Sequence, residues 1–327
     1  MTSKGLLILG KTPPPIGGVT IHVQRLVECV NRDGLSADFK TLDLKSLSTT
    51  MTAVARSKMV HLHTSNVYLR LFLAVWARLV STVFIFTLHG NLGRYGKVGN
   101  AMDEMTIRLA KVPVVINTGS YNRALELNKN TRLLSAFIPP VGITPLPKEL
   151  NDRVQHFVQK YDKCYCTNAF NLTFDRDGNE IYGISHLITF FQGQPNLGLI
   201  FSDPSGNYTE YLKDSGVDVS SNVMIIPFPH DAINILKLSD VFLRTTTTDG
   251  DSLSVREALY YGKGVVASDC VGRPDGCTLY ETSNFEDMGN KILNTRHADA
   301  KVSHENGYDQ LRLLYEEIAS ENKIKMF

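Results

Sequence analysis

Short apolar runs alternate with amphipathic stretches along the whole of this 327-residue chain. The apolar runs end in polar or glycine-containing loops and are apolar at successive positions, which is typical of strands buried on both faces of a parallel sheet. The stretches between them carry apolar residues at helical spacing. In the first half, this pattern predicts strands at Leu6–Leu9, Phe39–Leu42, Met59–His63, Val83–Leu88, Val112–Ile116 and Leu133–Ile138, and helices at Val19–Asn31, Val67–Val80, Glu104–Ala110 and Tyr121–Leu127.

A proline-containing run interrupts the alternation near the middle of the chain. Residues 139–147 read Pro-Pro-Val-Gly-Ile-Thr-Pro-Leu-Pro, a composition that excludes helix and stiffens the backbone. We interpret this run as the linker that ends an N-terminal domain, 1–147, before a C-terminal domain, 148–327. The alternation then resumes, with predicted strands at Tyr165–Ala169, Leu197–Phe201, Val223–Ile226, Val241–Leu243 and Val265–Ser268, and helices at Ile184–Phe191, Tyr208–Ser215, Ala232–Leu238, Ser252–Tyr261, Phe285–Leu293 and Glu305–Ala319. The pattern predicts an α/β fold of two Rossmann-like domains with a central cleft.

Composition places the chain among globular proteins, since 43% of its residues are hydrophobic and 20% are charged. Its five cysteines are scattered and odd in number, which suits a reducing compartment such as the cytoplasm better than a disulfide framework. The apolar stretch Tyr68–Leu88 contains Arg70 and Arg78, each of which costs about 2.5–3.5 kcal/mol near the centre of a bilayer. We therefore predict a helix and a buried strand there, and no transmembrane span.

The net charge of +1 conceals a strong asymmetry between the two halves of the chain. Residues 1–147 contain 17 Lys and Arg against 7 Asp and Glu, whereas residues 148–327 contain 17 against 26. A basic N-terminal half predicts a surface for an anionic partner, and charge alone fits nucleic acid, acidic lipid or a phosphate-bearing substrate.

The segment Val241–Gly276 carries the most specific chemical signal. A short apolar strand leads into a threonine-rich loop, a helix begins after Asp-Gly-Asp-Ser at 249–252, and a second apolar strand follows. Backbone N–H groups at a helix start attract phosphate. Asp249 and Glu257, near that start, can accept hydrogen bonds from the paired hydroxyl groups of a ribose or sugar. The segment therefore indicates binding of a nucleotide-activated sugar.

This segment resembles the donor site of GT-B-fold glycosyltransferases, most closely the retaining family 4, whose signature is E-G-F-G-x-x-x-x-E-A-x-x-x-G. Here Asp249 replaces the first Glu and Asp251-Ser252 replaces Phe-Gly, before Glu257. The resemblance implies that Glu257 holds the ribose hydroxyl groups, that Asp249 faces the donor sugar, and that the final helix crosses back to the first domain. The predicted donor-binding backbone is that of Gly250, Asp251, Ser252, Leu253 and Ser254.

Two other interpretations of these residues are open. Ser254-x-x-Glu257 also fits a capping box, in which Glu257 only accepts a backbone hydrogen bond. Asp249-x-Asp251 also matches the D-x-D motif of another glycosyltransferase fold, because hard cations are held by clustered carboxylates. Only these two acids are close in sequence, and a helix starts directly behind them. We therefore predict a donor site that requires no metal ion and no other cofactor.

The resembling family usually holds the donor diphosphate with an Arg and a Lys early in the second domain, and the usual Lys-Gly pair is absent here. Glu180-Ile-Tyr-Gly stands near its place. Arg176 is the local cation, and Arg244 and Arg273 are further candidates, since guanidinium binds phosphate through two N–H groups. Phe228 follows a predicted strand where the nucleotide base is expected, although a core position is the alternative.

The first domain carries glycines and histidines next to its predicted strands. Gly17 and Gly18 open a helix, so their N–H groups can approach a ligand, which is the donor phosphate in the resembling family; a tight turn is the alternative. His61 and His63 share one face of a strand and could bind a metal, but no third ligand is evident at useful spacing. His89 ends another strand, where the resembling transferases carry a His near the donor sugar.

A basic, glycine-containing loop follows His89. Its Arg94 and Lys97, with His63, form the predicted acceptor side, where cationic side chains could meet an acceptor phosphate. A solvated basic surface is the alternative interpretation.

The sequence thus predicts a retaining glycosyltransferase that moves a hexosyl or N-acetylhexosaminyl group from a nucleotide donor, with UDP as the expected nucleotide, to a hydroxyl group. The resemblance further implies a glycan or lipid-diphosphate-linked acceptor in lipopolysaccharide or capsule biosynthesis. It also implies a cytoplasmic location at the inner membrane face, peripheral membrane contact and no nucleic-acid partner. The alternatives are an inactive homologue that binds nucleotide without turnover and a nucleotide-sugar epimerase of the same fold.

Overall fold

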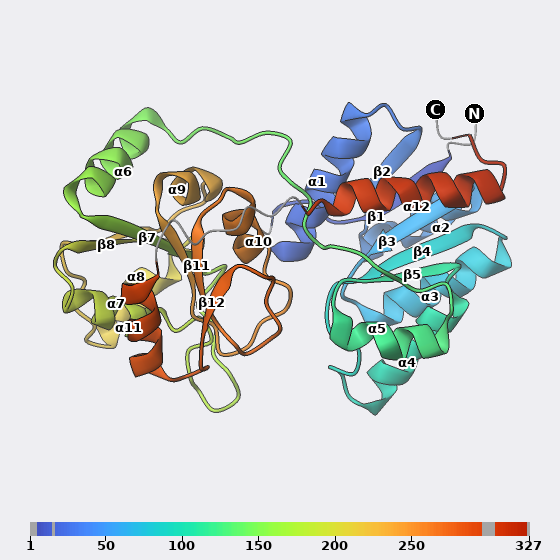
Figure 1. Ribbon diagram of the computed structural model, residues 1–327. Helices are drawn as coiled ribbons and strands as arrows, with labels where there is room; N and C mark the ends of the chain where they lie inside the picture. The colour runs from blue at the N-terminus through green and yellow to red at the C-terminus, as the bar shows by residue number, and fades with distance from the viewer. Residues whose placement is uncertain (1–4, 15–16, 296–304, 326–327) are drawn as a thin grey trace. The chain divides into compact units, whose positions relative to one another are not determined.

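The chain folds into two compact units, each built around its own sheet. The computed structural model describes residues 5–14, 17–295 and 305–325. Unit 1 comprises Met1–Val141 and Glu305–Phe327, and unit 2 comprises Gly142–His304. Each unit contains one six-stranded sheet with helices on both faces (Figure 1). The boundary falls inside the proline-containing run, and the C-terminal helix belongs to unit 1.

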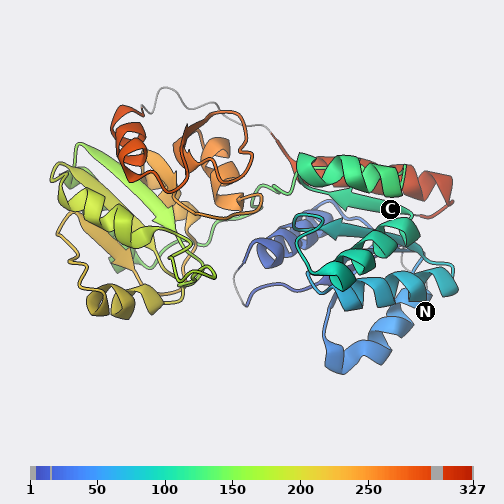
Figure 2. The same cartoon turned by 90° about the horizontal axis from the view of Figure 1, so that it is seen from below.

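The sheet of unit 1 is parallel throughout, in the order β2-β1-β3-β4-β5-β6. Its strands are β1 (Leu6–Gly10), β2 (Ala37–Thr41), β3 (Met59–His63), β4 (Val83–Leu88), β5 (Val112–Val115) and β6 (Arg132–Leu133). Helices α1 (Gly18–Arg32) and α12 (Gly307–Glu321) pack on one face of the sheet. The other face is covered by α2 (Leu47–Arg56), α3 (Val67–Leu79), α4 (Lys97–Leu109) and α5 (Thr118–Leu127), as Figure 2 shows from below.

Two helices of unit 1 differ from the sequence-based prediction. Helix α2 was not predicted, because the element is short and threonine, a poor helix former, occupies three of its ten positions. Helix α4 begins at Lys97 and not at Glu104, because its first turns carry few buried apolar residues that would reveal the helical period. The basic loop after His89 therefore ends at the first turn of a helix.

The predicted strand Leu133–Ile138 is reduced to the two residues of β6. Leu134 N still donates to Val115 O of β5 at 3.0 Å, but the next residues bond to the start of α12: Ser135 N donates to Gln310 Oε1 at 2.8 Å, and Gly307 N donates to Phe137 O at 2.6 Å. A side chain at Gly307 would overlap the Ser135 carbonyl oxygen, so this close approach requires glycine.

The sheet of unit 2 is also parallel, in the order β12-β11-β10-β7-β8-β9. Its strands are β7 (Lys163–Asn168), β8 (Leu197–Ser202), β9 (Val223–Ile226), β10 (Val241–Arg244), β11 (Gly264–Ser268) and β12 (Cys277–Tyr280). One face packs against α6 (Lys148–Lys160), α9 (Ile233–Leu238) and α10 (Leu253–Tyr260), and the other against α7 (Ile184–Gln192), α8 (Asn207–Asp214) and α11 (Phe285–Asn294). The predicted α/β class with two Rossmann-like parallel sheets is confirmed.

Sequence analysis missed two elements of unit 2. Strand β12 lies at an edge of the sheet, and its residues are mostly part-exposed, so it has no apolar run to reveal it. Helix α6 carries three buried apolar residues, Leu150, Val154 and Phe157, in an otherwise polar stretch.

The apolar stretch Tyr68–Leu88 forms helix α3 and strand β4, as predicted. Among the described residues, no helix is both long and apolar enough to cross a membrane. Arg70 of α3 is fully buried and pairs with Asp103 of α4, with Nη2 and Oδ1 2.6 Å apart. The pair joins two neighbouring helices inside the apolar layer of unit 1.

Replacing Asp103 with Ala should destabilise the protein strongly, because the Arg70 guanidinium would stay buried without its counter-charge. Breaking a buried pair in this way costs about 3–5 kcal/mol of unfolding free energy. Urea unfolding followed by circular dichroism measures the loss. The matched control is Glu126→Ala, which removes one exposed partner of Arg123 and should cost less than about 1 kcal/mol. Equal losses in the two variants would contradict a structural role for the buried pair.

Candidate functional site

The polar site of unit 2 lies where four neighbouring strands end. Strand β10 pairs in parallel with β7 on one side and with β11 on the other, and β7 also pairs with β8. The carboxyl ends of these strands therefore meet at one edge of the sheet, which is where open α/β sheets bind ligands. The last residues of the four strands are polar: Asn168, Ser202, Arg244 and Ser268.

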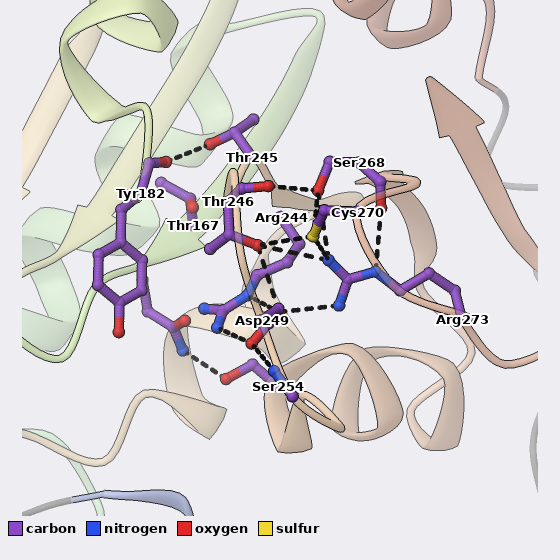
Figure 3. A network of polar contacts seen from close by, with 12 residues as sticks. Thr167, Tyr182, Arg244, Thr245, Thr246, Asp249, Ser254, Ser268, Cys270 and Arg273 are labelled. Atoms are coloured by element: carbon purple, nitrogen blue, oxygen red, sulfur yellow. Dashed lines mark hydrogen bonds and ion pairs between the residues drawn. The ribbon is translucent and has the colours of Figure 1, made fainter. Parts of the chain in front are cut away.

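Asp249 lies in the loop after β10 and is held by two arginines (Figure 3). Arg244 donates from Nε to Oδ2 at 2.8 Å and from Nη2 to Oδ1 at 3.0 Å. Arg273 donates from Nη1 to Oδ2 at 2.8 Å, and Gly250 N donates to Oδ1 at 2.9 Å. Both carboxylate oxygens of the residue predicted to face the donor sugar are thus engaged by protein donors.

The network around Asp249 is largely buried, and it fixes the charge of the carboxylate. Burial by itself raises the pKa of Asp249, but hydrogen bonds and charge from Arg244 and Arg273 outweigh it and hold the pKa below its usual value. Asp249 is therefore ionised at neutral pH. The side chain of Arg273 is only 2% exposed and also donates to the Ser268 carbonyl oxygen at 3.1 Å. The two guanidinium groups together carry one positive charge more than the Asp249 carboxylate that they face.

Glu257 lies inside helix α10 and is 9% exposed. It lines a pocket of about 10 Å³ together with Asn168, Ser202 and Ser254, which is room for about one water molecule. The capping-box alternative is wrong, because α10 begins at Leu253 with Ser252 as its N-cap. The hydroxyl of Ser254 instead accepts a hydrogen bond from Asn168 Nδ2 at 2.8 Å.

The predicted donor-binding backbone forms the entry to α10. Gly250 is exposed, and Asp251 pairs with Arg256 at 2.6 Å. The N-cap residue, Ser252, makes no side-chain capping bond. Its hydroxyl therefore does not occupy the N–H groups in the first turn of α10, which can donate to another acceptor. The two acids of the D-x-D pattern are thus each held by arginine, in different directions.

Glu180 occupies the start of helix α7, near the place of the family's Lys-Gly pair. Its two carboxylate oxygens accept hydrogen bonds from Ile184 N at 2.6 Å and Ser185 N at 3.1 Å. A helix start that could hold an anion is therefore taken by the protein's own carboxylate. Arg176 is exposed on the turn before it, and Phe228 is exposed after β9, so Phe228 is not a core residue.

Three polar residues at this edge escaped sequence analysis. Asn168 lies inside a predicted strand, Ser202 directly follows another, and His230 lies two residues after Phe228. In the structure, Ser202 Oγ and His230 Nε2 are 2.9 Å apart, and Asn168 bonds to Ser254. The sequence contained one indication of these residues, because each of them ends or follows an apolar strand. Only the order of the strands in the sheet shows that the three residues lie close together.

Gly17 and Gly18 of unit 1 mark the start of α1. Gly17 is the N-cap, with an extended backbone, so neither glycine serves a left-handed turn. A Cβ added at Gly18 would meet nothing within 4 Å. The described residues leave space for a side chain at Gly18, so the ligand-binding role of the two glycines stays a prediction, with a tight turn as its alternative.

Four histidines gather in unit 1. His61 uses both ring nitrogens, bonding Tyr315 Oη through Nδ1 and Thr87 Oγ1 through Nε2. His63 is 1% exposed, and its Nδ1 lies 3.0 Å from His89 Nε2. His22 of α1 lies beside this pair, so the fold brings to His63 two further rings, His22 and His89, that sequence spacing did not reveal. Burial lowers the pKa of all four rings, that of His22 to about 4, and keeps them neutral.

The predicted acceptor-side cations lie at the starts of α3 and α4. Lys97 is the first residue of α4 and lines a pocket of about 550 Å³ with Ser65–Tyr68 and Tyr95–Gly99. Arg94 donates from Nη2 to Tyr95 Oη at 2.6 Å, and Tyr95 Oη donates to Ser65 O at 2.8 Å. His63 and Arg94 do not line this pocket, although the charge of Arg94 reaches His89, the hydrogen-bond partner of His63. A shared acceptor side formed by the three residues stays a prediction.

Comparison with known proteins identifies the fold. No protein-family model matches the chain, and no curated sequence matches it significantly. Among solved structures, HepE from Anabaena in complex with UDP superposes with a TM-score of 0.72 at 13% identity, over 97% of this chain and 100% of HepE. A glycosyltransferase from Rickettsia africae gives a TM-score of 0.67 at 13% identity, over 96% of this chain and 98% of that one.

Sucrose-phosphate synthase from Thermosynechococcus elongatus is also similar, with a TM-score of 0.61 at 15% identity over 97% of both chains. HepE has in addition been crystallised with UDP-glucose. These proteins share almost the full length of the fold, at identities too low to carry residue roles. The chain therefore has the GT-B fold.

Proposed function

We propose that this protein is a retaining glycosyltransferase that takes its sugar from a nucleotide donor, with UDP as the nucleotide. The observation that carries the proposal is the position of Glu257, which lies at the carboxyl edge of the unit 2 sheet beside Asn168 and Ser254. A carboxylate there can accept hydrogen bonds from both ribose hydroxyl groups. The GT-B fold, shared with proteins crystallised with UDP and UDP-glucose, supports the assignment.

The positive charge around Asp249 supplies what transfer to a hydroxyl group needs. The leaving diphosphate gains negative charge in the transition state, and preorganised cations and N–H groups stabilise it. Arg244 and Arg273 are already fixed by their bonds to Asp249, so they need little reorganisation. In this proposal, Arg244 and Arg273 bind the diphosphate in place of the missing Lys. No metal ion is required for transfer, and His89 keeps its predicted catalytic role. The anomeric configuration of the product, read by proton NMR, tests retention.

One observation favours a second candidate, an inactive homologue that binds nucleotide without turnover. Both oxygens of Asp249 are engaged by arginines, and Glu180 fills the start of α7. Turnover distinguishes the candidates. Release of UDP that depends on an acceptor supports the transferase, and binding without release supports the homologue. Conversion of the donor sugar without an acceptor supports an epimerase.

For the acceptor, we propose a lipid-diphosphate-linked glycan at an anionic membrane, as in lipopolysaccharide or capsule assembly. Helix α3 exposes an apolar stripe at helical spacing that consists of Tyr68, Phe72, Val75 and Leu79. Val98 and Met105 of α4 are also exposed, and Arg78 and Lys97 lie beside these apolar side chains. Apolar and basic side chains together suit the surface of an acidic bilayer.

Nucleotide binding should depend on Glu257. In a thermal-shift panel of UDP, GDP, CMP, ADP, NAD and UDP-sugars, we expect UDP and a UDP-sugar to raise the unfolding temperature, with or without EDTA. A ligand at 100 times its dissociation constant stabilises by about 2.7 kcal/mol. Glu257→Gln keeps the size of the side chain and removes its charge. It should weaken UDP binding about 10-fold to 100-fold, because hydrogen bonds to a charged group contribute about 1.5–3 kcal/mol.

The control variant for this panel is Glu210→Gln, on the exposed side of α8 in the same unit, which should bind UDP like the wild type. If UDP raises the unfolding temperature equally in the wild type and in Glu257→Gln, Glu257 does not bind the ribose. A shift with NAD alone, or with no nucleotide, would refute the donor-site proposal.

Membrane contact should depend on the α3 stripe. The wild type should co-sediment with vesicles that contain phosphatidylglycerol and release at high salt, because screening weakens the attraction of basic side chains. Leu79→Ser should lower vesicle affinity about tenfold or more, since burying a leucine contributes about 1.5–3 kcal/mol. Leu293→Ser, at an exposed leucine of α11 in unit 2, serves as the control and should bind like the wild type. Equal binding to neutral and acidic vesicles, or no effect of Leu79→Ser, would count against this surface.

A further inference from the structure

Three imidazole rings converge in unit 1 from three different elements. His22 comes from α1, His63 ends β3, and His89 follows β4. One ring nitrogen from each lies within 4.8 Å of the others, and the ring centroids are 4.9–5.2 Å apart. Rings bonded to one tetrahedral zinc ion at N–Zn distances of about 2.0–2.1 Å have centroids about 5 Å apart. The spacing of the ring centroids is therefore compatible with a shared ion, around which the three nitrogens would draw together to about 3.3 Å from one another.

The hydrogen bond of His22 fixes its tautomer. Nδ1 lies 2.8 Å from the carbonyl oxygen of Ala136, and a carbonyl oxygen can only accept, so Nδ1 carries the proton. The lone pair is then on Nε2. Metal-binding histidines are commonly oriented in this way, with the second ring nitrogen donating to a carbonyl or carboxylate.

Two of the ring nitrogens are buried without a hydrogen-bond partner among the described residues. These are Nε2 of His22 and Nε2 of His63, whose residues are 2% and 1% exposed. Buried polar atoms in native proteins nearly always have a partner, and an unmade bond costs stability. If His63 donates from Nδ1 to His89 Nε2, its own Nε2 also carries a lone pair, and coordination by His89 exchanges this hydrogen bond for a metal bond. Two buried lone pairs beside a third imidazole lack the group that would satisfy them.

The protonation state of the rings agrees with metal binding. Burial lowers the pKa of His22 despite the opposing hydrogen bond to Ala136, with a smaller contribution from the charge of Arg25, and burial likewise holds the pKa of His63 and His89 well below the usual value. Neutral imidazole is the form that coordinates metal ions, so no proton must be removed from an imidazolium at neutral pH. His61 stands apart from this group, because hydrogen bonds use both of its ring nitrogens.

We propose that His22, His63 and His89 bind one transition-metal ion, with zinc the best match to three imidazoles, and leave one coordination position open. No carboxylate belongs to the group that these residues form within the described part of the chain. The ion keeps its full positive charge, so its open position favours an anionic oxygen ligand. This site belongs to unit 1 and shares His89 with the proposed transfer chemistry, whereas the donor binding proposed for unit 2 needs no metal.

The test measures bound metal directly on the full chain. Protein stripped with EDTA and exchanged into chelator-free buffer is given zinc, passed through a desalting column and analysed by inductively coupled plasma mass spectrometry. We expect about one zinc per chain. Cobalt as the probe should give visible absorption bands of a four-coordinate site, and added zinc should abolish them.

His22→Gln and His89→Gln should each lower zinc affinity about tenfold or more. Loss of a hydrogen bond that only supports a ligand already lowers metal affinity about tenfold to 100-fold, and loss of the ligand itself should lower it at least as much. His89 is the least buried of the three, so its variant keeps the test valid if His22→Gln does not fold. His156→Gln, at an exposed position of α6, controls for surface histidines and should retain zinc. A wild type without retained zinc, or unchanged zinc in folded His22→Gln and His89→Gln, would overturn the proposal. The UDP-induced change in unfolding temperature, measured in EDTA, tests the proposed donor site whether or not zinc binds.

Discussion

Parallel strand pairing is the constraint on which the rest of this structure depends. In a parallel sheet every strand ends at the same edge, so polar residues that close the strands are collected there whatever their separation in sequence. In unit 2 this brings Asn168, Ser202 and Arg244 to one edge. In unit 1 the same rule places His63 and His89 side by side, because β3 and β4 are neighbours. Both candidate sites are consequences of strand order.

The two sites handle electrostatics in opposite ways. In unit 2 a buried carboxylate is kept ionised by two arginines, which leaves fixed positive charge where a diphosphate could bind. Charge of this kind is useful because the protein has already oriented it. In unit 1 the clustered groups are imidazoles, and burial keeps them neutral. Neutral nitrogens inside a protein are poor partners for phosphate and good ligands for a metal ion.

The departures from the family 4 pattern are physically connected. Arg244 and Arg273 both reach the shorter Asp249, and Glu180 neutralises the start of α7. In the proposed transferase, the positive charge that a lysine would bring near α7 comes from Arg244 of β10 and from Arg273 in the loop after β11. This redistribution explains how a chain without the Lys-Gly pair can keep a cationic diphosphate site in the proposed transferase.

The sequence by itself determined the fold class, since buried strands and amphipathic helices leave distinct periods in it, as at Met59–His63 and Val67–Leu79. It also singled out Asp249 and Glu257, whose spacing lies within one local segment. It could not show β12 or α2, because β12 is mostly part-exposed and α2 is short and rich in threonine, a poor helix former. Only the tertiary structure decided that Arg273 reaches Asp249 and that His22 joins His63 and His89. Such contacts link residues far apart along the chain, and their partners are chosen by strand order and helix packing, which no local pattern records.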